Sequence, residues 1–135
     1  MAIRKASYYS MKVSQRPGAG AQLLAALKAA KVNLLAFTGF PAGGGAQVDF
    51  IPQDQAKFAK AARKAKWKLS PRKTVFLAQG DDKVGALTRI LGSLAKAKIN
   101  LVSLQAVTAG KRRYGAMFWV KRKDVAKASR LLKAR

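Results

Sequence analysis

Cysteine, histidine and glutamate are absent from this chain of 135 residues. Without cysteine there is no disulfide bond and no thiolate metal site. Without histidine there is no imidazole ligand, and the side chain that most often serves as a general base near neutral pH is missing. The acidic residues are five aspartates, at positions 49, 54, 81, 82 and 124. We therefore expect no bound metal and no cofactor.

Catalysis would have to come from these few carboxylates, helped by lysine or tyrosine. Asp81 and Asp82 are adjacent in the sequence, so on a strand they point to opposite faces and cannot flank one substrate as paired carboxylates. The sequence also contains no phosphate-binding loop and no recognisable pair of nucleophile and base. It therefore predicts a protein that is not an enzyme and has no catalytic residues.

Negative charge is scarce: 28 lysines and arginines against five aspartates give a formal net charge of +23. Small folded domains ordinarily carry a net charge of about 2 to 8 in magnitude. A field of this sign attracts polyanions, so weak, non-specific binding of nucleic acid is expected. The basic residues are spread along the whole chain, which fits a solvated basic coat equally well.

Long apolar runs are missing as well. No run approaches the ~18 residues that a membrane-spanning helix needs. No apolar segment of the secretory type follows Met1. We therefore expect a cytoplasmic protein without membrane insertion.

The sequence does contain an internal repeat, with a spacing of 67 residues. Residues 17–34 align with residues 84–101, and eight of the eighteen aligned positions are identical. The identical pairs are Gly18/Gly85, Ala19/Ala86, Leu24/Leu91, Leu27/Leu94, Ala30/Ala97, Lys31/Lys98, Asn33/Asn100 and Leu34/Leu101. Alanine is common throughout, but the coincidence of the glycine, the leucines and the asparagine indicates duplication of one structural unit.

Periodicity places elements in the same order in both copies. The first copy is expected to have strands at 7–14, 34–40, 47–51 and 67–70, a helix between Gly18 and Val32, and a helix from Asp54 to about Lys66. The second is expected to have strands at 74–79, 101–108 and 114–120, a helix after Gly85, and a last helix capped by Asp124. The apolar stripes that should face the core are Leu23, Leu24 and Leu27 in one helix and Leu87, Ile90, Leu91 and Leu94 in its counterpart.

This order is the ferredoxin-like βαββαβ plan. We predict an α+β fold of two such units, 1–70 and 71–135, each an antiparallel sheet with helices on one face. The second unit has no residues left for its fourth strand. Its sheet is then either shorter or completed by residues 2–6 or by another chain. Because an unpaired sheet edge invites a partner, we expect a homodimer.

The loops and helix ends resemble those of the ACT domain, a small-molecule regulatory module of amino-acid metabolism. Residues 15–19 (Gln-Arg-Pro-Gly-Ala) precede the first helix, and residues 32–34 (Val-Asn-Leu) follow it. The second copy keeps the glycine and the asparagine, in Val-Gly-Ala at 84–86 and Ile-Asn-Leu at 99–101, but lacks the proline. The resemblance covers essentially the whole chain as a tandem pair of ACT-like units.

The resemblance implies an amino-acid site at the loop between the first strand and the first helix, usually where two ACT units pack together. Carried over to this chain, the ligand-binding residues are Gln15, Gly18, Asn33, Asp82, Gly85 and Asn100. A helix N-terminus independently suits a carboxylate, because it offers free N–H donors and partial positive charge. The glycines could instead be tight-turn residues, and the asparagines helix C-caps. The predicted function is non-catalytic, ligand-sensing regulation.

A basic nucleic-acid-binding protein is the alternative function. RNA-recognition motifs share the βαββαβ order and stack bases on aromatic residues of the third strand. Residues 113–120 (Arg-Tyr-Gly-Ala-Met-Phe-Trp-Val) are basic and aromatic, but they fit the RNA-binding octamer poorly, so Tyr114, Phe118 and Trp119 are expected to be packing residues. The basic residues of 54–68, 111–113 and 121–123 could still follow a phosphate backbone.

Overall fold

The computed structural model describes residues 2–135, which form two compact units. We call Ser7–Lys73 the N-unit, and residues 2–6 together with Thr74–Arg135 the C-unit. The first strand is therefore shared, because residues 2–6 of it belong to the C-unit and the remainder to the N-unit. A single cut of the chain near residue 70 does not describe this division.

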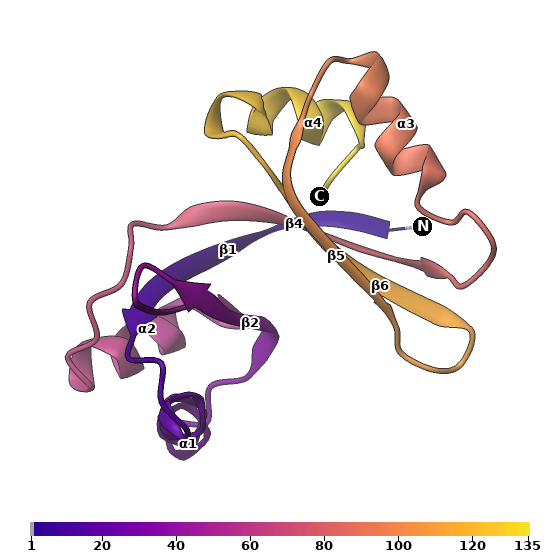
Figure 1. The fold of residues 1–135 in the computed structure, drawn as a ribbon. Helices are drawn as coiled ribbons and strands as arrows, with labels where there is room; N and C mark the ends of the chain where they lie inside the picture. The colour runs from indigo at the N-terminus through magenta and orange to yellow at the C-terminus, as the bar shows by residue number, and fades with distance from the viewer. Residues whose placement is uncertain (1) are drawn as a thin grey trace. The chain divides into compact units, whose positions relative to one another are not determined.

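The elements of each unit run strand, helix, strand, strand, helix (Figure 1). They are β1 Ala2–Val13, α1 Ala19–Ala29, β2 Leu34–Ala42, β3 Gly45–Pro52, α2 Gln55–Lys64, β4 Lys73–Asp81, α3 Thr88–Lys96, β5 Leu101–Thr108, β6 Arg113–Val120, the 3-10 helix η1 Arg122–Asp124 and α4 Val125–Leu131. The predicted α+β class, with two ferredoxin-like βαββαβ units, is confirmed.

In the N-unit the strands lie in the order β2-β3-β1, with antiparallel pairing. Alternate strand residues share one face, and that face packs against α1 and α2 in one buried cluster. Its members are Tyr9, Met11, Leu27, Val32, Val48, Phe50 and Phe58. The Phe50 ring lies 5.2 Å from that of Phe58 and 5.4 Å from that of Trp67, so this aromatic group joins β3, α2 and the segment after α2.

In the C-unit the order is β1-β4-β6-β5. The edge beside β4, for which the repeat leaves no residues, is occupied by the N-terminal part of β1. Ile3 packs into the buried cluster of this unit, and the backbone amide of Arg135 donates to the Ile3 carbonyl at 3.1 Å. Of the alternatives left open by the sequence, completion by residues 2–6 is therefore the one that the fold adopts. The unpaired edge from which a homodimer was predicted is thus filled within the chain, and it no longer supports that prediction.

The backbone repeats with the same spacing of 67 residues as the sequence. Left-handed φ angles recur at equivalent positions, and so does a bulge at the start of the second strand of each unit. The equivalent left-handed pairs are Gly18/Gly85, Lys31/Lys98, Gly43/Gly110, Gly44/Lys111 and Lys66/Lys133. The last pair follows α2 and α4, so the repeat extends well beyond the aligned sequence at 17–34 and 84–101.

Local predictions fail where a side chain competes with the expected pattern. Residues 67–70 form no strand: Ser70 N donates to Ser10 O at 2.8 Å, but Ser10 N donates to the Ser70 hydroxyl instead of a carbonyl. Leu24 and Leu91 are 41% and 37% exposed rather than buried, because the buried face of α1 is centred on Leu27 and that of α3 on Ile90 and Leu94. The side chain of Asp54 caps α2, as predicted, whereas the side chain of Asp124 makes no capping bond to α4.

Candidate functional site

The loop between β1 and α1 leaves the start of the helix open. Gly18 is the N-cap residue, with a left-handed φ of 87°, and it has no side chain to cap the helix. No acidic residue lies in the first turn. The left-handed backbone explains why glycine stands here, since other residues adopt it only with strain. The Ala19 amide donates to Arg16 O at 3.3 Å, and the next N–H groups of α1, which carry partial positive charge, face a position without a protein anion.

A hollow of about 500 Å³ lies beside this loop, entirely within the N-unit. Its polar lining residues are Ser14, Gln15 and Arg16, and its apolar lining residues include Phe40 and Pro41 of β2. The Arg16 guanidinium is exposed and donates to Gln22 Oε1 at 3.4 Å. A lining that combines cationic, amide and hydroxyl residues with apolar ones suits a small molecule with an anionic group and an apolar part.

Asn33 lies far from this hollow within the N-unit, because it follows the other end of α1. The helix has 11 residues, about 16 Å at 1.5 Å per residue. The Asn33 side-chain amide donates to Gln53 Oε1 at 2.9 Å, and Gln53 N donates to Asn33 O at 3.0 Å. The residue with left-handed backbone after α1 is Lys31, so the C-cap interpretation of Asn33 was wrong.

The corresponding loop of the C-unit has a different character. Asp82 is exposed, and its backbone amide donates to Arg112 O at 2.8 Å. Gly85 has a φ of 73°, and a Cβ there would lie 3.3 Å from the Thr88 hydroxyl. The α-helix begins only at Thr88, after a turn over residues 84–87. This loop therefore has Asp82 where the N-unit has Gln15, and Lys83 where the N-unit has Arg16.

Asn100 is exposed at the far end of α3, just as Asn33 follows α1. Within each unit the structure thus brings together the loop residues, Gln15 with Gly18 and Asp82 with Gly85, but not the asparagines. Sequence reasoning missed Arg16 and Phe40 as lining residues. Arg16 stands inside the motif itself, whereas the position of Phe40 follows only from the pairing of β2 with β3.

A buried polar cluster on the N-unit sheet was not predicted. The carboxylate of Asp49 is only 7% exposed and accepts hydrogen bonds from the Thr38 hydroxyl at 3.0 Å and the Gln47 amide at 3.1 Å. Burial, and secondarily the charge of Asp49, raise the pKa of Tyr8 above its ordinary value of 10.0. These bonds satisfy both carboxylate oxygens, so the cluster has a structural explanation.

The aromatic residues of β6 do not form an open platform for bases. Tyr114, Phe118 and Trp119 are 7%, 0% and 6% exposed. Phe118 stacks on Phe76, with ring centroids 5.2 Å apart, inside the buried cluster of the C-unit. Base stacking requires accessible ring faces, so their assignment as packing residues is confirmed.

Residues 2–135 contain neither a cluster of metal-binding side chains nor a membrane-spanning helix. No group of three or more acidic side chains there is arranged to hold a metal ion. No helix in the same part of the chain is long and apolar enough to cross a membrane. The β1–α1 loop and its counterpart between β4 and α3 therefore remain the candidate site.

Comparison with known proteins gives likeness in structure but not in sequence. No protein-family model matches the chain, and no curated protein sequence does. The solved structure of protein BT0572 from Bacteroides thetaiotaomicron superposes with a TM-score of 0.82 at 18% identity, over 97% of this chain and 88% of that one.

Aspartate kinase structures share the fold of this chain. The regulatory subunit from Thermus thermophilus, in ligand-free form, has a TM-score of 0.64 at 12% identity, over 98% of this chain and 96% of that chain. Aspartokinase III from E. coli, solved with aspartate and ADP, has a TM-score of 0.57 at 13% identity, over 97% of this chain but 32% of that chain. At these identities the likeness establishes the duplicated, ACT-like fold.

Proposed function

We propose that this chain is a non-catalytic regulatory protein of the tandem ACT type, which binds a free amino acid at its strand–helix loops. The observation that carries the proposal is the hollow beside the start of α1, whose lining residues include Gln15, Arg16 and Phe40. The helix terminus and Arg16 provide donors for a carboxylate. The apolar wall accommodates a side chain. Regulatory subunits of aspartate kinase share the fold, which supports the assignment without naming the ligand.

The asparagines enter the site only if a second copy contributes them. Asn33 and Asn100 lie a helix length away from the loop of their own unit, and each carries both a donor and an acceptor. In a symmetric dimer the loop of one copy can meet the post-helix asparagine of its partner, and the reverse contact follows by symmetry. We therefore place Gln15 or Asp82 on one side of the ligand and Asn33 or Asn100 on the other, in a homodimer.

The first experiment is a thermal-shift screen of the twenty amino acids, followed by calorimetry on any that stabilise the chain. At about a hundred times its dissociation constant a ligand adds roughly 2.7 kcal/mol of stability. Replacing Arg16 with Gln should weaken binding about tenfold to a hundredfold, because a charge-assisted hydrogen bond contributes about 1.5–3 kcal/mol. Asp82→Ala should weaken the binding of a ligand whose ammonium group is held by this carboxylate.

Glycine variants separate access to the loop from backbone strain. Gly18→Val should block the approach of a carboxylate, and Gly110→Val is the matched control. Gly110 has a φ of 83° against 87° for Gly18, and a Cβ at either position would meet no atom within 4 Å. Both variants therefore carry the same strain, but only Gly18→Val should abolish binding. Equal loss of binding in the two variants would remove this loop from the proposed function.

A mixing experiment tests whether the site is shared between copies. Arg16→Gln and Asn33→Ala are each expected to bind poorly as pure variants. In an equimolar mixture, half of the dimers pair one variant with the other, and each such dimer contains one intact site, so about a quarter of all sites should recover. No recovery from two binding-deficient, dimeric variants would contradict a site that spans two copies.

A further inference from the structure

The helices of the N-unit carry a concentrated set of positive charges. Along α2 the buried side is formed by Phe58 and Ala62, while the exposed side is basic. The contact between Asn33 and Gln53 places the end of α1 beside the start of α2, which adds two lysines from α1. We call this set the basic helix surface; its residues are Lys28, Lys31, Lys57, Lys60, Arg63 and Lys64.

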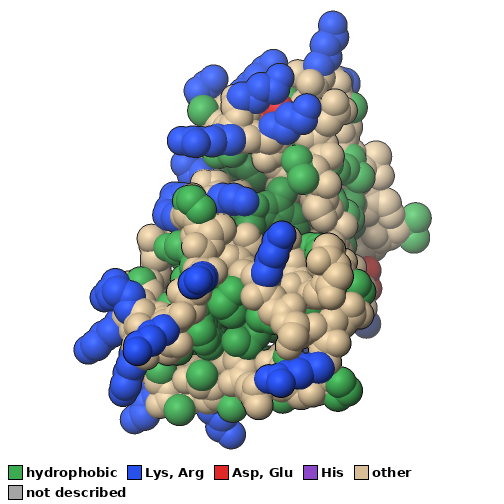
Figure 2. Space-filling model, turned by 60° about the vertical axis from the view of Figure 1, so that its left-hand side comes forward, with side chains coloured by type: hydrophobic (Ala, Val, Ile, Leu, Met, Phe, Trp, Pro, Cys, Tyr) green, Lys and Arg blue, Asp and Glu red, His purple; other side chains and the backbone are tan. Residues whose placement is uncertain are grey.

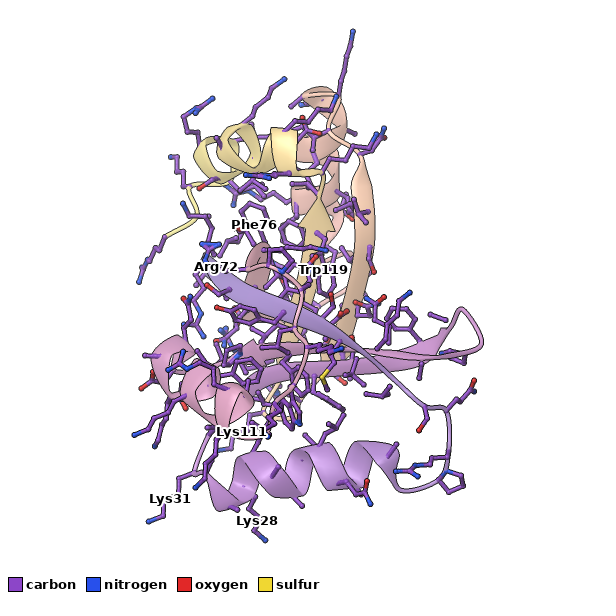
Figure 3. All side chains as sticks on the ribbon, turned by 90° about the vertical axis from the view of Figure 1, so that its left-hand side faces the viewer. Lys28, Lys31, Arg72, Phe76, Lys111 and Trp119 are labelled. Atoms are coloured by element: carbon purple, nitrogen blue, oxygen red, sulfur yellow. The ribbon has the colours of Figure 1, made fainter. Side chains whose placement is uncertain are left out.

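Acidic side chains do not neutralise this surface. The N-unit has two acids: Asp49 is buried in the sheet, and Asp54 is engaged at the start of α2 by the Lys57 backbone amide at 3.1 Å. Among residues 2–135, none of the six cations forms an ion pair. Figure 3 shows Lys28 and Lys31 extending from α1 away from the sheet, and Figure 2 shows basic side chains over the visible face with few acidic ones.

Part of this positive set recurs in the C-unit. Residues 55–66, which include α2, align with residues 122–133 at the same spacing of 67, and five of these twelve positions are identical. Three of the five are cations, in the pairs Lys60/Lys127, Arg63/Arg130 and Lys66/Lys133. These three cations recur in the C-unit, whereas Lys57 aligns with Asp124 and Lys64 with Leu131.

Each α-helix is followed by a lysine in a left-handed backbone conformation, where glycine would be less strained. The second residue after the end of each of the four α-helices has a left-handed backbone conformation. In all four cases this residue is a lysine. Their φ angles are 58°, 60°, 59° and 53° at Lys31, Lys66, Lys98 and Lys133. Glycine is the ordinary residue at such positions because a Cβ is crowded there. These four lysines give every one of the four α-helices a positive charge at its C-terminus.

We propose that the basic helix surface binds the phosphate backbone of nucleic acid without reading its sequence. Lys57, Lys60 and Lys64 lie on one side of α2 over about 10 Å, comparable with three steps of a strand at ~3.4 Å each. No aromatic side chain belongs to the surface, so base stacking plays no part. Membrane helices insert an exposed apolar face, whereas the large apolar side chain of α2, Phe58, is wholly buried in the core.

This activity is independent of amino-acid binding and gives the charge of +23 a specific use. The test uses fluorescence anisotropy of a labelled, mixed-sequence DNA duplex of about 20 base pairs, from about 50 to 200 mM salt. The quadruple variant Lys57→Gln, Lys60→Gln, Arg63→Gln and Lys64→Gln is compared with wild type. Glutamine is a good helix former, so α2 should persist. Two double variants, one for each half of the set, replace the quadruple variant if it does not fold.

The matched control removes the same charge from exposed positions of the C-unit outside the basic runs at 111–113 and 121–123, as Arg4→Gln, Lys5→Gln, Lys83→Gln and Arg89→Gln. Each phosphate contact on a duplex contributes about 0.9 to the slope of log affinity against log salt. The α2 variant should therefore lower that slope by about 3 to 4, and the control by less than about 1. A second duplex of different sequence should bind equally well.

Three results would overturn the proposal. Equal losses in the two quadruple variants would mean that only net charge matters. Absence of salt-dependent binding in the wild type would remove the activity altogether. Binding to phosphatidylserine vesicles but not to DNA would assign the surface to membranes. Amino-acid binding measured on the α2 variant should be unchanged, so the failure of either proposal can be recognised separately.

Discussion

Replacement of a left-handed lysine by glycine should stabilise the protein, and Lys66 after α2 is the clearest position. Its φ is 60°, its N–H donates to Arg63 O at 3.1 Å, and the next amide, Trp67 N, donates to Ala62 O at 3.0 Å. This is the Schellman arrangement, in which the left-handed position prefers glycine. Lys66→Gly keeps both backbone bonds and removes the crowded Cβ.

The size of the effect follows from opposing terms. A non-glycine residue where φ is positive costs about 1 kcal/mol relative to glycine, after allowing for the greater freedom of glycine in the unfolded chain. Losing a cation at a helix C-terminus costs about 0.3 kcal/mol or more, less in salt. We expect Lys66→Gly to raise the free energy of unfolding by about 0.5 kcal/mol or slightly more. The same change at all four helix ends should add up to about 2 kcal/mol, because distant sites are nearly additive.

Urea unfolding at moderate salt measures this prediction, with Lys60→Gly as the control. Lys60 lies inside α2 and is exposed, so the control removes the same charge from the same helix. Glycine in a helix interior is destabilising, here by about 0.5–1 kcal/mol. The two variants should therefore shift the urea midpoint in opposite directions. If Lys66→Gly destabilises the chain as Lys60→Gly does, the argument from backbone strain is refuted.

Three further predictions concern the cap, the half-buried Tyr8 and assembly. Asp54→Ala should lower the free energy of unfolding by about 1 kcal/mol, measured in urea, because it removes the side-chain acceptor of the Lys57 amide. The pKa of Tyr8 is raised in the folded chain, so its contribution to stability is present below pH 10 and is lost as pH rises through the folded pKa. Tyr8→Phe should therefore reduce the loss of stability measured by thermal unfolding at alkaline pH. Light scattering should give twice the 14.5 kDa chain mass at micromolar concentration, and a persistent monomer would contradict the homodimer.

The candidate site was predictable only in part. Gln15 and Gly18 belong to one loop in the sequence, so their proximity needs no long-range contact. The apolar wall at Phe40 comes from a strand that meets the loop only through sheet pairing. The same distinction separates Asn33 from the loop: its motif is next to the helix in sequence, but a rigid helix keeps its two ends apart.

Sequence by itself determined what depends on local pattern: two copies 67 residues apart, the helices and all but one of the predicted strands, and the Asp54 cap. Alternation, helical periodicity and capping act within a few residues, so they can be read along the chain. Only the tertiary structure decided that residues 2–6 of β1 complete the sheet of the C-unit beside β4. The partner of an open sheet edge depends on the whole fold and cannot be read from local pattern. It also decided that Leu24 and Leu91 stay exposed, since the width of the buried arc on a helix depends on what packs against it.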